Sequence, residues 1–114
     1  MHELGVVFHC IEQINSIAAE NNVKKIRRVT VEIGEVSTVI PHLFEDVWKW
    51  AVKKEDILRE CELDIQIVHA LTHCDECGTD YPTVKHGKTC PQCGSGKTWL
   101  IQGNEMVIKE LEIE

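Results

Sequence analysis

Two matched cysteine turns constrain this chain more than any other feature of its sequence. Two residues separate Cys74 from Cys77, two separate Cys90 from Cys93, and twelve residues lie between the pairs. A glycine follows the second cysteine of each pair, and a residue free to adopt positive φ lets such a turn close. The short spacing lets both thiolates of a turn face one ion. The sequence therefore predicts a tetrahedral four-thiolate zinc site of the zinc-ribbon kind.

Other uses of the four thiolates stay open at this point. Iron also occupies tetrahedral sulfur sites, a single Cys-x-x-Cys pair can carry out redox catalysis, and cysteines can simply be buried. His73 and His86 lie in or beside this segment and can replace a lost thiolate, although exposed histidines are the simpler interpretation. The matched turns favour zinc. Because four thiolates fill the coordination shell, we expect the ion to support structure and not catalysis.

The charge and apolar runs of the chain argue against several classes of protein. Its 114 residues carry a formal net charge of -7, and residues 73–99 carry three basic and three acidic side chains. Without a basic stripe we expect no nucleic-acid binding. The apolar run at residues 4–8 is too short for a secretory signal, and no run has the length of a membrane span. We therefore expect a cytoplasmic protein with no membrane contact, whose six cysteines are not disulfides.

Apolar periodicity predicts two helices and three strands. A helix is expected from about residue 3 to residue 21 or 22, with a stripe of Leu4, Val7, Phe8, Ile11, Ile14, Ile17 and Ala18. Pro41 suits the first turn of a second helix, whose stripe is Phe44, Val47, Trp48, Ala51 and Val52. Alternating apolar residues predict strands over 29–33, ending at Gly34, from 63 to about 72, and over 106–113.

This order of elements predicts an α+β fold. Two helices would pack on a small sheet of about three strands, with a zinc-ribbon-like subdomain inserted between two of the strands. We expect residues 1–72 and 100–114 to form the α+β domain and residues 73–99 to form the inserted zinc-binding subdomain.

The other two cysteines can be explained by packing alone, and Trp50 can be explained by packing or by partner binding. Cys10 lies on the apolar side of the first helix and Cys61 just before a strand, so we expect both to be small buried apolar residues. Trp50 points away from the stripe that contains Trp48. It either binds a partner or folds against a neighbouring element.

The first three residues, Met1, His2 and Glu3, form a second candidate metal site. The Met1 amine, the backbone nitrogen of His2 and its Nδ1 can close two adjacent chelate rings on one ion. The amide or carboxylate of Glu3 is a nearby fourth donor. Such a nitrogen-rich, near-planar set suits Ni(II) or Cu(II). The competing interpretation is a histidine that merely precedes a helix.

Taken together, these residues resemble the HypA/HybF family of nickel metallochaperones of [NiFe]-hydrogenase maturation. The resemblance covers the MHE start, the first helix, the VEIGE strand end, both cysteine turns and the QGNEM stretch before the last strand. It implies Ni(II) binding through His2 with backbone groups of Met1 and Glu3. It also implies structural Zn(II) at Cys74, Cys77, Cys90 and Cys93.

The resemblance also implies partners. The family delivers nickel to the hydrogenase large subunit together with the GTPase HypB, and in some organisms it also supplies urease maturation. Neither a catalytic site nor a choice between monomer and homodimer follows from the sequence, and we expect no enzymatic activity. The competing functions are a zinc-ribbon adaptor, a nucleic-acid-binding module without a nickel role, and a metalloenzyme.

Overall fold

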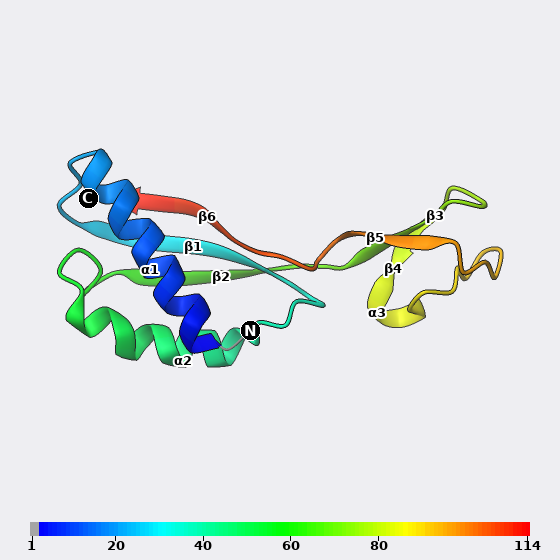
Figure 1. Cartoon of the computed structure of the whole chain (residues 1–114), viewed down its shortest axis with the longest axis horizontal. Helices are drawn as coiled ribbons and strands as arrows, with labels where there is room; N and C mark the ends of the chain where they lie inside the picture. The colour runs from blue at the N-terminus through cyan, green and yellow to red at the C-terminus, as the bar shows by residue number, and fades with distance from the viewer. Residues whose placement is uncertain (1–2) are drawn as a thin grey trace. The chain divides into compact units, whose positions relative to one another are not determined.

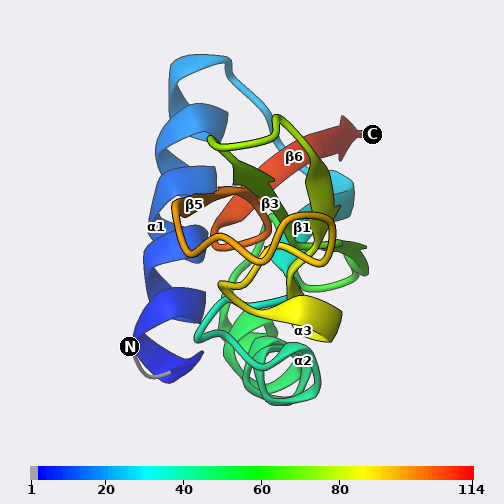
Figure 2. The ribbon, with the colours of Figure 1, turned by 90° about the vertical axis from the view of Figure 1, so that its right-hand side faces the viewer.

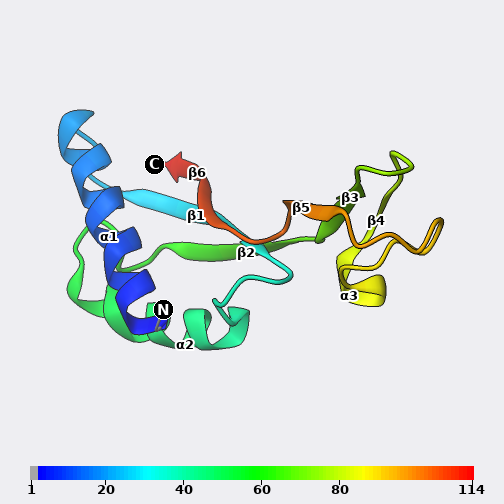
Figure 3. The ribbon, with the colours of Figure 1, turned by 45° about the vertical axis from the view of Figure 1, so that its right-hand side comes forward.

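The computed structural model describes residues 3–114, and Figures 1 and 3 label their elements in two views. The elements are, in order, α1 (Glu3–Glu20), β1 (Ile26–Gly34), α2 (Pro41–Ala51), the short 3-10 helix η1 (Val52–Lys54), β2 (Glu62–Val68), β3 (Leu71–Cys74), β4 (Asp80–Pro82), α3 (Thr83–His86), β5 (Thr98–Gln102) and β6 (Met106–Ile113). They form two three-stranded sheets, of order β2-β1-β6 and β4-β3-β5. The predicted α+β class is confirmed.

The chain divides into two compact units. The helix–sheet unit comprises the described residues up to Glu32, Thr38–Gln66 and Val107–Glu114, and the cysteine unit comprises Ile33–Ser37 and Ile67–Met106. The segment predicted as a zinc-binding insertion, residues 73–99, lies inside the cysteine unit. The exact limits of that insertion and the roles of the two parts stay predictions.

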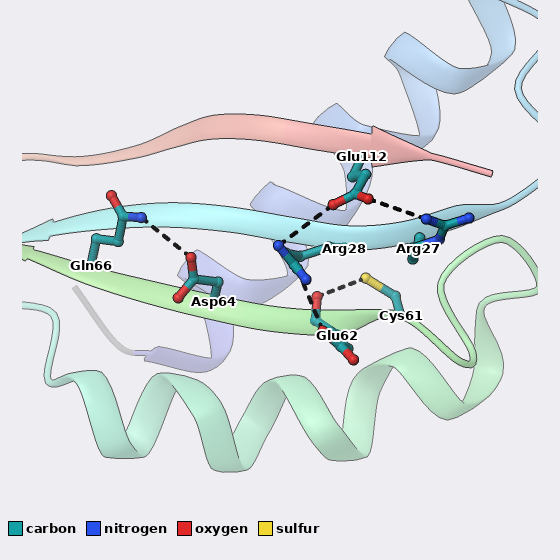
Figure 4. Close-up of polar contacts among 7 residues, drawn as sticks. All are labelled: Arg27, Arg28, Cys61, Glu62, Asp64, Gln66 and Glu112. Atoms are coloured by element: carbon teal, nitrogen blue, oxygen red, sulfur yellow. Dashed lines mark hydrogen bonds and ion pairs between the residues drawn. The ribbon is translucent and has the colours of Figure 1, made fainter.

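In the helix–sheet unit, the central strand β1 separates a buried face from a polar one. Val29 and Val31 are fully buried, as is the next alternate residue of β1, Ile33, which belongs to the cysteine unit. Figure 2 shows α1 and α2 on one side of the sheet. On the other face Arg28 bridges the neighbouring strands through Glu62 at 3.4 Å and Glu112 at 3.6 Å (Figure 4). This alternation was predicted for residues 29–33, but β1 begins earlier, at Ile26.

The buried face of α1 differs from the predicted stripe. Leu4, Phe8 and Ile17 are 48%, 45% and 43% exposed, whereas the buried set is Val6, Val7, Cys10, Ile11, Ile14 and Ala18. At about 100° per residue, Leu4 and Phe8 lie at one edge of the apolar arc, whereas Ile17 lies between the buried Val6 and Cys10. The core therefore receives a face rotated away from Leu4 and Phe8. The prediction was wrong for these two residues and for Ile17, whose exposure the helical spacing does not explain.

The predicted strand from residue 63 to about 72 is two strands. β2 ends at Val68, and β3 begins at Leu71 in the other sheet. Between them, the Gln102 side chain donates to the carbonyl of His69 at 2.9 Å, and Ala70 N–H donates to the Glu35 carboxylate at 2.8 Å. These bonds replace the ladder partners that a continuous strand would use.

Two glycines permit a close crossing of backbone segments in the cysteine unit. A Cβ on Gly34 would lie 2.1 Å from the carbonyl oxygen of Gly103, and a Cβ on Gly103 would lie 2.5 Å from Cα of Ala70. Gly103 also has a φ of 102°. Both positions therefore require glycine.

Candidate metal centre

The two cysteine turns have the same backbone geometry. Gly78 N–H donates to the Cys74 carbonyl at 2.8 Å, and Gly94 N–H donates to the Cys90 carbonyl at 2.8 Å. The two glycines have φ values of 74° and 75°, which is the left-handed region expected from the sequence. Each turn therefore presents two thiols from one rigid loop.

The four predicted thiols come together in space. The sulfur atoms of Cys74, Cys77, Cys90 and Cys93 all lie within 4.8 Å of one another. Two Sγ–Sγ pairs, Cys74–Cys93 and Cys77–Cys90, are 3.6 Å apart. A Zn–S bond of about 2.3 Å in a tetrahedron places sulfurs ~3.8 Å apart. The cluster is therefore spaced to hold a metal ion and is consistent with zinc.

Tyr81 forms the apolar support of the cluster. It is 2% exposed and packs in one buried group with Cys74 and Cys90, and its hydroxyl donates to the Gly87 carbonyl at 2.9 Å. β4 holds Tyr81 opposite Thr72 of β3, so the sheet brings the ring beside the sulfurs. The sequence analysis missed this role. The sequence did contain an indication of this role, because Tyr81 is the only Phe, Trp or Tyr residue between the two cysteine turns.

The thiols of the cluster differ in their affinity for protons. Hydrogen bonding with the Thr79 hydroxyl, 3.2 Å from the sulfur, lowers the pKa of Cys77 to about 6. A backbone hydrogen bond from Ser95 lowers the pKa of Cys93, but desolvation and the neighbouring sulfurs outweigh it and raise that pKa to about 12. The Cys77 thiol therefore ionises readily, whereas the neighbouring sulfurs oppose ionisation of Cys93. A bound cation removes this conflict, since it stabilises all four thiolates together.

The two nearby histidines have other contacts. His73 Nδ1 lies 2.6 Å from a carboxylate oxygen of Asp80, and its ring is 5.4 Å from that of Trp99. The His86 ring packs edge-on against Tyr81 at 5.8 Å. Among residues 3–114 the four-cysteine group is the only set of three or more side chains placed to hold a metal. Ligation by His73 or His86 after loss of a thiolate stays a prediction.

Of the candidate nickel ligands, Met1 and His2 lie outside the described residues. Glu3 begins α1, and its carboxylate accepts a hydrogen bond from the backbone N–H of Ile40 at 3.3 Å. Ile40 is the N-cap residue of α2. One carboxylate oxygen of Glu3 therefore has a hydrogen-bond partner at the start of α2.

The other sequence candidates are placed as follows. Cys10 is 1% exposed, as predicted, whereas Cys61 is only partly buried and its thiol donates to the Glu62 carbonyl at 3.1 Å (Figure 4). Trp50 is 53% exposed and contacts Phe8 of α1 edge-on at 6.2 Å. It therefore does fold partly against a neighbouring element. No helix among the described residues is long and apolar enough to cross a membrane.

Comparison with known proteins assigns the whole chain to one family. The family described as "Hydrogenase/urease nickel incorporation, metallochaperone, hypA" matches residues 1–113. The chain belongs to the HypA family. Its membership, together with the four-cysteine cluster, supports a nickel metallochaperone of hydrogenase maturation.

Individual HypA relatives match this chain over nearly their whole lengths. The hydrogenase maturation factor HypA of Aquifex aeolicus is 35% identical over 114 residues, which is 100% of this chain and 98% of the relative. That of Trichodesmium erythraeum is 36% identical over 115 residues, covering 100% and 96%. The solution structure of the Ni metallochaperone HypA from Helicobacter pylori is 31% identical and superposes with a TM-score of 0.74, covering 99% and 97% of the two chains.

Proposed function

We propose that this chain binds Ni(II) at its first residues and delivers it to the large subunit of a [NiFe]-hydrogenase during maturation. The Met1 amine, the His2 backbone nitrogen and imidazole, and the Glu3 amide would supply a nitrogen-rich donor set that suits Ni(II). The observation that carries this proposal is the HypA family match from residue 1 to residue 113, which includes the MHE start.

We assign zinc, rather than nickel, to the four cysteines. Four thiolates fill a tetrahedral coordination shell and leave no open position, so an ion there exchanges slowly and stabilises the fold. A few nitrogen donors at the start of a chain release an ion more readily to a better-coordinated receiver. The two metals would therefore serve opposite purposes, with Zn(II) as a structural ion and Ni(II) as transient cargo.

The proposed partners follow from the family. They are the GTPase HypB, the hydrogenase large subunit and, in some organisms, urease maturation proteins. Monomer and homodimer are both compatible with the proposal, and no enzymatic step is required of this chain.

Nickel titration of the zinc-loaded protein tests the terminal site. We expect His2→Ala, and a variant with extra residues ahead of Met1, each to lose nickel affinity by at least ~10-fold, because each removes a donor. His9→Ala is the matched control, since His9 is an exposed histidine of α1. Affinity should also fall as the pH drops through the histidine range, because the donor nitrogens must be unprotonated.

Equal nickel binding by the native protein, His2→Ala and the extended variant would refute the terminal site. A zinc-ribbon adaptor without a nickel role would then be the better proposal. Salt-dependent binding to nucleic acid would instead favour the nucleic-acid-binding alternative.

A further inference from the structure

The four sulfurs of the cluster form two close pairs, and each pair joins the two turns. Cys77 Sγ lies 3.6 Å from Cys90 Sγ, and Cys74 Sγ lies 3.6 Å from Cys93 Sγ. Each pair takes one sulfur from each turn. Because a disulfide bond has an S–S length of about 2.05 Å, a small movement of two side chains closes either pair. The cluster is therefore arranged for disulfides between the turns.

One cysteine of each pair is open to solvent and the other is not. Cys77 and Cys93 are exposed, whereas Cys74 and Cys90 are 0% and 1% exposed. A Cβ built on Gly78, directly after Cys77, would meet nothing within 4 Å. An exposed thiolate beside a second thiolate is the usual arrangement of an oxidant-sensitive cysteine, because the first is attacked and the second resolves the product.

A hydroxyl group distinguishes Cys77 from the other exposed cysteine. The Thr79 hydroxyl lies 3.2 Å from Cys77 Sγ, whereas Cys93 receives a hydrogen bond from the backbone of Ser95. A hydroxyl rotates to suit its acceptor, so it can donate to the oxygen that leaves when a peroxide bond breaks. A backbone N–H is fixed in direction. Cys77 is therefore the better placed of the two to react with a peroxide.

The charges around Cys77 favour a small neutral oxidant. Asp75 and Glu76 lie between the two cysteines of the first turn, and both are exposed. Lys97 pairs with Glu76 at 3.1 Å. Four thiolates also carry more negative charge than one Zn(II) ion neutralises. An anionic oxidant is therefore repelled from the sulfur, whereas hydrogen peroxide is not.

We propose that Cys77 is the site at which a hydroperoxide oxidises the cysteine unit, and that Cys90 resolves the product as a disulfide between the two turns. The inference rests on the proposed assignment of zinc to the four cysteines. It is independent of the nickel proposal, since none of the residues involved is a candidate nickel ligand.

The reaction consumes one hydroperoxide and two thiolates. A lone pair of the Cys77 sulfur attacks one oxygen of hydrogen peroxide, and an S–O bond forms as the O–O bond breaks and hydroxide leaves. The Cys90 thiolate then attacks the sulfur of this sulfenic acid, and the S–S bond forms as the S–O bond breaks and a second hydroxide leaves. Both hydroxides take protons from solvent and become water. Each sulfur is oxidised by one electron, and the two electrons reduce the peroxide.

The disulfide removes half of the ligands of the metal. Cys74 and Cys93 alone do not make a structural zinc site, which requires four ligands. Zn(II) therefore leaves, and the cysteine unit loses the folding free energy that the ion supplied. A dithiol reductant reverses the oxidation and regenerates the site.

Zinc release from the zinc-loaded chain carrying Cys61→Ser tests the reaction. This background is chosen because trypsin leaves Cys61 in one peptide with Cys74 and Cys77. Hydrogen peroxide is added in the presence of the zinc dye 4-(2-pyridylazo)resorcinol, and oxidised glutathione is the anionic comparison. We expect peroxide to release the zinc at least ~10-fold faster than oxidised glutathione does, and dithiothreitol with added zinc to restore the site.

Two failures of this experiment are distinguishable. A chain that holds no zinc before the oxidant is added refutes the zinc assignment. Zinc that stays bound in peroxide, or that oxidised glutathione releases as fast, overturns only the proposed reaction.

Peptide mapping after one equivalent of peroxide identifies the bond. Trypsin cuts between the two turns, and Glu-C protease cuts after Glu76, between the cysteines of the first turn. A Cys77–Cys90 disulfide therefore joins fragments 77–85 and 89–97 in the mass spectrum. The proposal is overturned if fragment 89–97 stays unlinked, as it does when disulfides form within the turns. A first link between 89–97 and the fragment that contains Cys74 equally overturns it.

Thr79→Val removes the hydroxyl group and leaves all four cysteines in place. We expect zinc release by peroxide to slow by about 3–10-fold, as for the loss of one hydrogen bond. Thr79→Ser keeps the hydroxyl and should react at the native rate. Thr89→Val is the matched control, since Thr89 is an exposed threonine directly before Cys90.

Release of zinc to a chelator without peroxide should be equal in all these chains. A merely structural role of Thr79 would change that rate as well. If peroxide releases zinc from Thr79→Val as fast as from the parent chain, the role of Thr79 is wrong, and the choice of Cys77 over Cys93 is overturned with it.

Discussion

The carboxylate of Glu3 accepts a hydrogen bond from the backbone N–H of Ile40, with 3.3 Å between the two atoms. Glu3 is the first residue of α1 and Ile40 is the N-cap of α2. Ile40 has no side-chain hydrogen bond to offer the helix start, so the carboxylate from α1 supplies an acceptor there. This contact joins the beginning of α1, at one of the proposed nickel ligands, to the beginning of α2.

Glu3→Ala should therefore destabilise the fold without removing the nickel site. We expect the free energy of unfolding to fall by about 0.5–1.5 kcal/mol, the usual contribution of one hydrogen bond, as measured by urea denaturation. Glu3→Gln keeps an acceptor oxygen and should lose less. Glu12→Ala, at an exposed position of α1, is the control. Loss of nickel binding in Glu3→Gln would show instead that the carboxylate is a ligand.

Removal of the metal from the four cysteines should unfold the cysteine unit selectively. Structural zinc sites contribute ~10 kcal/mol or more to folding, because the unfolded chain offers no preformed site. We expect chelation, or Cys77→Ser, to abolish the folded-state amide signals of β3, β4 and β5 in an NMR spectrum. Those of α1 and α2 should persist. Zinc content measured by mass spectrometry should fall from one ion per chain. Cys61→Ser should keep the zinc, and its loss there would contradict the assignment.

Tyr81 should matter to the cysteine unit mainly through its ring. Tyr81→Phe removes only the hydrogen bond to Gly87 and should cost about 0.5–1.5 kcal/mol. Tyr81→Ala also removes the ring beside Cys74 and Cys90 and should cost ~3–5 kcal/mol, as for other buried aromatic residues. Thermal unfolding of the zinc-loaded variants measures both. Equal losses would show that the hydroxyl, and not the packing, supports the cluster.

Features set by local sequence could be predicted, and features set by tertiary packing could not. The gathering of the four sulfurs follows from two short turns, each specified by two cysteines and a glycine. The buried face of α1, by contrast, depends on where α2 lies. Phe8 is apolar and in the right period, yet it stays 45% exposed at the edge beside Trp50. Periodicity locates an apolar arc but not its centre.

The break between β2 and β3 was missed for a related reason. Leu63, Ile65 and Ile67 alternate with polar residues, and the change of phase at Val68 is the one local sign of where β2 ends. The strand ends because Glu35 and Gln102, both distant in sequence, bind the backbone of residues 69 and 70. Contacts of this kind are invisible to a pattern that considers only neighbouring residues.

The two cysteines outside the cluster, Cys10 and Cys61, should make the fold less stable at alkaline pH. Burial raises the pKa of Cys10, and that of Cys61, from 9.0 to about 11. Below pH 9 both thiols are protonated in the folded and unfolded chains. Between about pH 9 and pH 11 the unfolded chain loses these protons first, so the free energy of unfolding falls as the pH rises.

Cys10→Ala should flatten this alkaline loss, because alanine cannot ionise. Urea denaturation of the zinc-loaded protein between pH 8 and pH 11 gives the slope, with the native chain as reference. A slope unchanged in Cys10→Ala would mean that Cys10 ionises equally readily in the folded and unfolded states.

Gly103→Ala should be among the most damaging single substitutions outside the cysteines. Its Cβ would lie 2.5 Å from the backbone of Ala70, and its φ of 102° is unfavourable for any residue with a side chain. Because backbone cannot move aside as a flexible side chain can, we expect a loss of at least ~1–3 kcal/mol, measured by thermal unfolding. Gly96→Ala is the matched control, because a Cβ there meets nothing within 4 Å. If both variants unfold alike, the close crossing of backbone at Gly103 does not stabilise the cysteine unit.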